Sequence, residues 1–296
     1  MTLIALASVK GSPGVTTAAA ALAASWPKGR RVLLVEADPF GGDLAPRYGV
    51  APTGGLSSLF AAARRTLQSG DVWDHVDHLP GGLPVLFGLG GMHHAVANEK
   101  AWPIVTDVLG ALEADVVIDV GRLLPNLGGG VREVLARVDV LVVLCPATLE
   151  AIVHLREALP SLTAELRGRS LLVVPTGAPQ FSAADIARTL AVEVVPPMPN
   201  DPGAAGALAN RRSMKRLERT RLLRWAAETL GALGIEAAPP VESEVLQDPG
   251  EPTEAHPIAT TAADRADMCQ PDESLDRSTS DGQLAGTAST TTREAV

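Results

Sequence analysis

Short apolar runs alternate along the chain with segments of helical periodicity. The first run, residues 3–9, predicts a buried strand, and an alanine-rich helix is predicted from Thr16 to about Trp26. Further apolar runs predict strands at residues 31–36, 84–87, 116–120, 138–145, 170–175 and 192–195. Helices are predicted between them, at residues 56–67, 101–112, 147–158 and 182–190.

This alternation predicts the fold class. Strands and helices follow one another from residue 3 to about residue 233, which is typical of an α/β fold with a doubly wound, mostly parallel sheet and helices on both faces. Ser182 is expected to cap the last of the predicted helices, with Asp185 at a capping-box-like position. In such a fold the ligand crevice lies at the carboxyl ends of the strands.

The composition changes at about residue 238. The net charge of the 296-residue chain is −9, and the segment from Pro239 onward, with twelve acidic and three basic residues, accounts for all of it. This segment is rich in Pro, Glu, Asp, Ser and Thr and cannot bury enough apolar surface to offset the cost of ordering. We therefore expect a folded domain at residues 1–237 and an acidic disordered tail at residues 238–296.

Cysteines and long apolar runs are scarce. Cys145 and Cys269 are far apart and lack Cys-x-x-Cys spacing, which argues against a disulfide framework or a zinc site. His93 and His94 are interpreted as ordinary loop residues. No apolar run reaches about 18 residues, so no transmembrane segment is expected. Residues 3–9 are too short for a signal peptide, and a cytoplasmic protein is expected.

A glycine-containing loop separates the first strand from the first helix. Loop N–H groups and a helix N-terminus together bind phosphate well. The common phosphate-loop pattern G-x-x-x-x-G-K-[ST] does not match, because Val9 stands in place of its first glycine and Val15 in place of its lysine. The sequence thus predicts a phosphate-binding loop without its usual cation.

Two acidic residues fall at strand ends. Asp38 follows the second strand, and Asp119 interrupts the apolar run at residues 116–120. A carboxylate in such a place can hold an attacking water or a magnesium ion, the latter bridged to Thr16. A turn or capping role for each acid is the alternative. Gly121 and Gly128–Gly130 would give the following loop the freedom of a nucleotide-sensing switch, although an ordinary turn also uses glycine there.

The segment Lys-Gly-Ser-Pro-Gly-Val-Thr-Thr, from Lys10 to Thr17, resembles the deviant Walker A loop K-G-G-x-G-K-T-T of the ParA/MinD family of ATPases. Ser12 replaces a glycine and Val15 replaces the second lysine. Residues 36–44 resemble the family's D-x-D-P-x-x-G-D-L stretch, particularly that of its CpaE/TadZ-like pilus-assembly members, with Glu36 for the first Asp. The resemblance covers about residues 1–233.

The resemblance implies a P-loop NTPase fold that binds ATP and Mg²⁺. Asp38 would orient the hydrolytic water, and Lys10 would reach the partner's phosphates in a nucleotide-sandwich homodimer. Thr16, Asp38 and Asp119 would hold the metal. The base would lie beside the turn at residues 196–201, and Thr176-Gly177 leaves its identity open. The nucleotide-binding loop would comprise Lys10, Gly11, Ser12, Pro13, Gly14, Val15, Thr16 and Thr17.

Val15 bears directly on the expected function. Losing a loop lysine in a partly desolvated site costs on the order of 2–5 kcal/mol. We expect an ATP-binding switch with weak ATPase activity at most, which dimerises around nucleotide. It would position or regulate a larger protein assembly of pilus, secretion, septum or partition type. A nucleotide-independent pseudo-ATPase scaffold and a nonspecific DNA-binding partition ATPase are the alternatives.

The segment from Arg211 to Arg224 carries seven basic residues and one acid. It could contact DNA or an anionic membrane surface. It could equally be the solvated face of a closing helix that packs Leu217, Leu222, Leu223 and Leu230 on the sheet. The second interpretation is preferred. Any membrane association of the chain is expected through protein partners.

Overall fold

The computed structural model describes residues 1–10, 13–123, 128, 130–209 and 218–237. Within these residues one sheet of eight strands has the order β3-β4-β2-β5-β1-β6-β7-β8. Neighbouring strands are parallel except for β3 and β4, which are antiparallel. The strands are β1 (Leu3–Ser8), β2 (Val32–Glu36), β3 (Asp77–His78), β4 (Pro84–Leu86), β5 (Asp115–Arg122), β6 (Val140–Pro146), β7 (Ser170–Thr176) and β8 (Glu193–Val194).

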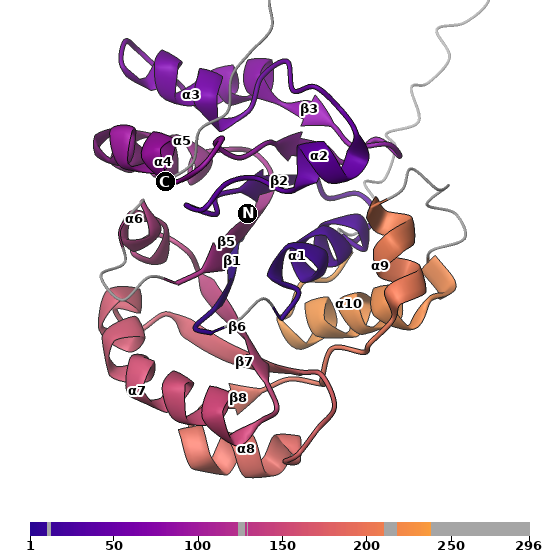
Figure 1. The fold of residues 1–296 in the computed structure, drawn as a ribbon. Helices are drawn as coiled ribbons and strands as arrows, with labels where there is room; N and C mark the ends of the chain where they lie inside the picture. Colours follow the sequence, from indigo (N-terminus) through magenta and orange to yellow (C-terminus); the bar gives the residue numbers. More distant parts are fainter. Residues whose placement is uncertain (11–12, 124–127, 129, 210–217, 238–296) are drawn as a thin grey trace, which may run out of the picture. The chain divides into compact units, whose positions relative to one another are not determined.

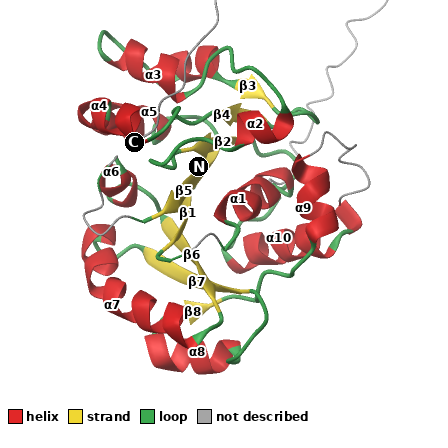
Figure 2. Cartoon of the chain, in the orientation of Figure 1, coloured by secondary structure: helices red, strands yellow, loops and turns green. Residues whose placement is uncertain are grey.

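Helices cover both faces of this sheet, which lies between them in Figures 1 and 2. One face carries α1 (Val15–Ala24), α2 (Leu44–Tyr48), α9 (Pro202–Ala209) and α10 (Arg221–Ala232). The other carries α3 (Leu56–Ala63), α4 (Met92–Ala97), α5 (Trp102–Leu109), α6 (Val131–Leu135), α7 (Leu149–Leu166) and α8 (Ala183–Leu190). The 3-10 helices η1 (Gly70–His75) and η2 (Glu99–Ala101) complete the described elements. The predicted doubly wound α/β fold is confirmed.

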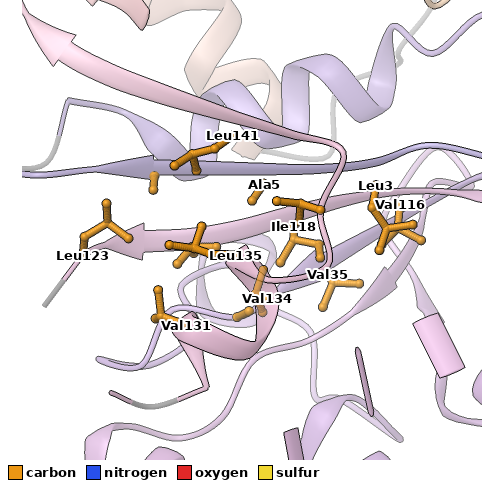
Figure 3. Close-up of a cluster of buried hydrophobic side chains, with 14 of the residues drawn as sticks. Leu3, Ala5, Val35, Val116, Ile118, Leu123, Val131, Val134, Leu135 and Leu141 are labelled. Carbon is orange, nitrogen blue, oxygen red and sulfur yellow. The ribbon is translucent and has the colours of Figure 1, made fainter. Parts of the chain in front are cut away.

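Two apolar cores lie on the two faces of the sheet. The central strand β5 contributes Ile118 and Val120 to one core and Val117 to the other, as the two-residue period of a strand requires. Figure 3 shows part of the first core, where Ile118 lies with the side chains of α6. The second core contains the buried alanines of α1, whose small side chains suit close packing of this helix on the sheet. This explains how a chain with 3% aromatic residues fills its interior.

Most predicted elements are confirmed with shifts of a few residues at their ends, but α7 continues to Leu166, well beyond the predicted end at residue 158. Ser182 caps α8 by accepting a hydrogen bond from the Asp185 N–H. The placement of His93 and His94 in a loop is wrong, because both lie in α4. The exposed strand β3 and the short helix α2 lack a clear periodic pattern and were not predicted.

The basic segment is only partly described. Residues 210–217 lie outside the described residues, as does the predicted tail at 238–296. Leu222, Leu223 and Leu230 are buried as expected, but α10 packs mainly against α1 and α9 in place of the sheet. No helix in the described part of the chain has the length and apolar character needed to cross a membrane.

Candidate functional site

The carboxyl ends of β1, β2 and β5 open onto a cavity of about 320 Å³. The cavity brings Asp38 together with the second half of the predicted phosphate loop, from Gly14 to Thr17. Gly11 and Ser12 lie outside the described residues, so the loop is described from Pro13 onward. The cavity is lined by Ser8, Gly14, Val15, Thr16, Thr17, Asp38, Phe40, Asp43, Arg47, Gly121 and Arg122.

The loop enters helix α1 through Gly14. The φ of this residue is 95°, a left-handed conformation that favours glycine, and its carbonyl oxygen accepts the first hydrogen bond of α1 from the Ala18 N–H. The next residue, Val15, is 5% exposed and belongs to the core between α1 and the sheet. The cavity wall is therefore apolar where the common phosphate loop presents an ammonium group.

Asp119 is fully buried at this end of β5. Its Oδ1 atom accepts a hydrogen bond from the Gly121 N–H at 3.0 Å, whereas Oδ2 has no hydrogen-bond partner among the described residues. Burial raises the pKa of Asp119 to about 7, against the lowering effect of the nearby Thr16 hydroxyl. A buried carboxylate with one unsatisfied oxygen fits either a bound cation or a proton.

Asp38 is half-buried beside Asp119. Its Oδ1 atom accepts a hydrogen bond from the Phe40 N–H at 2.8 Å, and its side chain packs against Gly121, where a Cβ atom would collide with the carboxylate. Burial raises the pKa of Asp38 to about 6, and the charges of Asp43 and Glu36 add to this rise. Both aspartates therefore contact Gly121, but only Asp38 lines the cavity, because Asp119 is fully buried.

Glu36 has a structural role that the sequence did not predict. Its carboxylate is 1% exposed and accepts hydrogen bonds from the N–H groups of Asp43 at 2.6 Å, Leu44 at 2.8 Å and Gly88 at 3.0 Å. Burial nevertheless raises the pKa of Glu36. These bonds fix both ends of the segment that carries Asp38 and join it to the loop after β4.

Lys10 lies apart from the residues that line the cavity. Its Nζ atom is 2.9 Å from Nε2 of His154 on α7, so the ammonium group donates to the imidazole within the same chain. The structure thus places Lys10 at the surface next to the loop, with its charge directed toward α7.

A second cavity of about 510 Å³ lies on the other side of the loop and shares Gly14 and Thr17 with the first. The dipeptide Thr176-Gly177 and part of the turn at residues 196–201 meet here, as the sequence led us to expect. This cavity is lined by Pro13, Gly14, Thr17, Pro146, Thr176, Gly177, Met198, Pro199, Asn200, Asp201, Pro202, Ala205 and Leu222.

The donor set near Asp119 suits a metal ion that is held jointly with a ligand. Among the described residues no group of three His, Cys, Asp or Glu side chains could hold a metal by itself. Mg²⁺ commonly takes one or two carboxylates together with phosphate oxygens and waters. The unsatisfied Oδ2 of Asp119 beside Thr16 fits this kind of shared coordination.

The arrangement of strands and helices has counterparts among solved structures. The chain has the fold of the ParA/MinD ATPases. A ParA family ATPase of Chlorobium tepidum TLS superposes with a TM-score of 0.65 at 17% identity, over 77% of this chain and 98% of that one. Pyrococcus horikoshii OT3 MinD with Mg-ADP gives 0.62 at 17% identity, over 79% and 97%.

An ATP complex of a McdA variant from Cyanothece gives a TM-score of 0.61 at 19% identity, over 80% of this chain and 98% of that one. No family model and no curated protein matches the chain. Likeness at this level of identity establishes the fold alone, so function has to be argued from the residues of the site.

Proposed function

We propose that this chain is an ATP-binding switch of the ParA/MinD kind. The observation that carries the proposal is that Thr16 and Asp38 line one cavity while the buried Asp119 lies next to both of them, since these residues come from three separate segments of the chain. A buried carboxylate with an unsatisfied oxygen is costly unless a cation or proton compensates it. A magnesium–triphosphate group supplies that compensation.

The two cavities together suit a nucleotide. The phosphates would occupy the cavity that contains Thr16 and Asp38, and the nucleoside would occupy the larger one beside Thr176 and Met198. Gly14 and Thr17 line both and would lie where the two parts of the ligand join. Two structures with the same fold were determined with Mg-ADP and with ATP.

Thr16 and Asp119 would hold the metal ion together with phosphate oxygens, and Asp38 would orient water near it. The bound ion supplies charge to stabilise the phosphates. The chain's own contribution is to hold Asp119 out of solvent and to keep Asp38 against Gly121.

Hydrolysis by this site would be weak at most. Val15 leaves the phosphates without the loop lysine, and Lys10 contacts His154 in its own chain. Lys10 could complete the site only in a second copy, so nucleotide-dependent dimerisation follows from the proposal. The dimer would position or regulate a larger protein assembly, of the CpaE/TadZ-like pilus or secretion type, the septum type or the partition type.

A nucleotide-independent scaffold is the second candidate, and the burial of Val15 in the core of α1 favours it. A scaffold would dimerise without regard to ATP and would tolerate loss of Lys10. The basic residues that would support DNA binding lie largely within residues 210–217, outside the described residues, so no described contact favours a partition ATPase.

Calorimetric titration of ATP into the full chain, with and without Mg²⁺, tests the proposal when combined with light scattering for mass. We expect micromolar binding, dependence on Mg²⁺ and a doubling of mass with ATP. The variant Asp119→Asn should lose the Mg²⁺ dependence, whereas the control Glu157→Gln, at an exposed position on α7, should bind as the parent does. Absence of binding at millimolar ATP would exclude the switch and leave the scaffold.

A further inference from the structure

The charge balance of the first cavity singles out one arginine. The cavity's basic residues are Arg47 and Arg122 within the described part of the chain. Arg47 already forms an ion pair with Asp43, at 3.0 Å between Nη2 and Oδ2. Arg122 has neither an ion pair nor a hydrogen bond through its side chain to any described residue. Its guanidinium group is the cation that remains available for a ligand.

A bulge in β5 determines where Arg122 points. Leu6 of β1 pairs with Asp119, but the next residue, Ala7, pairs with Gly121, so the register shifts by one residue at this point. Gly121 has a φ of 65°, which glycine adopts without strain. A bulge of this kind commonly re-aims the side chains that follow it.

The burial pattern shows the effect of this bulge. Ile118 and Val120 face the core beneath α6, and Leu123 returns to the same core, where Figure 3 shows it beside Val131. In a regular strand, Leu123 would face the opposite side from Val120. Because of the extra residue, Arg122 lies on the face of Asp119 and α1, which is the face of the cavity.

We propose that Arg122 is a phosphate-binding residue that replaces the missing loop lysine. The proposal rests on the proposed function, because the anion concerned is the polyphosphate of the nucleotide. Arg122 pairs in the sheet with Ser8, the last residue of β1, and therefore stands where the phosphate loop begins. A guanidinium group binds phosphate through two parallel hydrogen bonds, so it can supply both charge and orientation from this position.

The position of Arg122 also allows its side chain to be replaced without disturbing the fold. The Arg122 side chain is exposed and its neighbours Gly121 and Leu123 are buried, so shortening the side chain leaves the strand and its core intact. Arg65 is a matched control because it is also an exposed arginine, and it lies just after α3, outside the lining of both cavities.

The test is calorimetric titration of the full chain with Mg-ATP and, separately, with inorganic pyrophosphate. We expect Arg122→Ala to weaken both affinities about 10- to 100-fold, and Arg122→Lys to fall between it and the parent. Arg65→Ala should change them by less than about threefold. Unchanged binding by Arg122→Ala, or an equal loss in Arg65→Ala, would overturn the proposal, provided thermal melting shows that both variants are folded.

The two ligands separate this inference from the function on which it rests. If the parent protein binds pyrophosphate through Arg122 but does not bind ATP, the nucleotide switch is wrong and the anion-binding role of Arg122 stands. If it binds ATP and Arg122→Ala has no effect, only the role of Arg122 is wrong. If it binds neither ligand, both proposals are overturned.

Discussion

The carboxylate of Glu36 accepts a hydrogen bond from the Leu44 N–H at 2.8 Å, across the seven residues that contain Asp38. The same side chain also binds the N–H groups of Asp43 and Gly88. Hydrogen bonds to a charged, buried acceptor hold a loop more firmly than those to a neutral one. The position of Asp38 at the cavity therefore depends on a residue that does not itself line the cavity.

Replacing Glu36 by Gln tests this dependence. The amide presents an N–H group where the carboxylate accepts hydrogen bonds, so we expect the free energy of unfolding to fall by about 1–3 kcal/mol. The affinity for Mg-ATP should also fall, because the segment with Asp38 is less firmly held. Urea unfolding and calorimetry measure the two effects. Glu133→Gln, at a surface ion pair with Arg137, is the control and should cost less than about 1 kcal/mol.

The buried aspartates predict how stability depends on pH. Burial raises the pKa of Asp38 to about 6 and that of Asp119 to about 7, so the folded chain binds more protons than the unfolded chain above about pH 4. Without ligand, stability should be highest at the acid end of this window. It should fall as the pH rises through 6 and 7, with a decrease in Tm of about 5–10 °C.

Asp119→Asn provides the check on this pH dependence. The variant has no charge to bury at position 119, so its Tm should fall less than that of the parent between pH 5 and pH 8 and should exceed that of the parent at pH 8; the fall that remains comes from Asp38. Asp74→Asn, at an exposed position on η1, should follow the parent. A parent protein that becomes more stable as the pH rises from 5 to 8 would contradict the assignment of both aspartates as buried and uncompensated.

The contact between Lys10 and His154 leads to a prediction about nucleotide-dependent dimerisation. Since Lys10 donates to His154 within its own chain, His154→Ala frees the ammonium group for a partner. We expect nucleotide-dependent dimerisation to strengthen about three- to tenfold, and to be lost in Lys10→Ala. Sedimentation in the presence of Mg-ATP measures both, with Arg156→Ala on the exposed side of α7 as the control. Equal dimerisation of all four proteins would favour the scaffold.

The fold was predictable from the sequence because its main signals are local. The uniformly apolar runs and the glycines between them predict strands, and Asp38 and Asp119 fall at strand ends that must share one edge of a parallel sheet. Three short elements carry no such signal: β3 has two exposed or half-buried residues, and α2 and α4 are short helices with mixed residues.

Parts of the candidate site depend on contacts between distant segments. The sequence predicts that Gly121 gives freedom to the loop that follows, whereas in the structure Gly121 belongs to a bulge whose position is set by pairing with β1. The orientation of Arg122 follows from that pairing and has no signal in its neighbours along the chain. The three N–H donors to Glu36 come from two loops, which the sequence does not bring together either.

The variant Val15→Lys, which restores the loop lysine, is expected to bind Mg-ATP more tightly than the parent. In Val15→Lys the ammonium group enters the cavity wall that Val15 now makes apolar, and it adds a charge next to Thr16. We expect Mg-ATP affinity to rise about tenfold or more and phosphate release to become measurable. Val15→Met, which lengthens the side chain without charge, separates charge from bulk and should give neither gain.

In the double variant Val15→Lys, Arg122→Ala, recovery of the affinity lost in Arg122→Ala would show that the two cations serve the same phosphates. Failure of that recovery, with Val15→Lys alone active and folded, would mean that Arg122 acts on another part of the ligand.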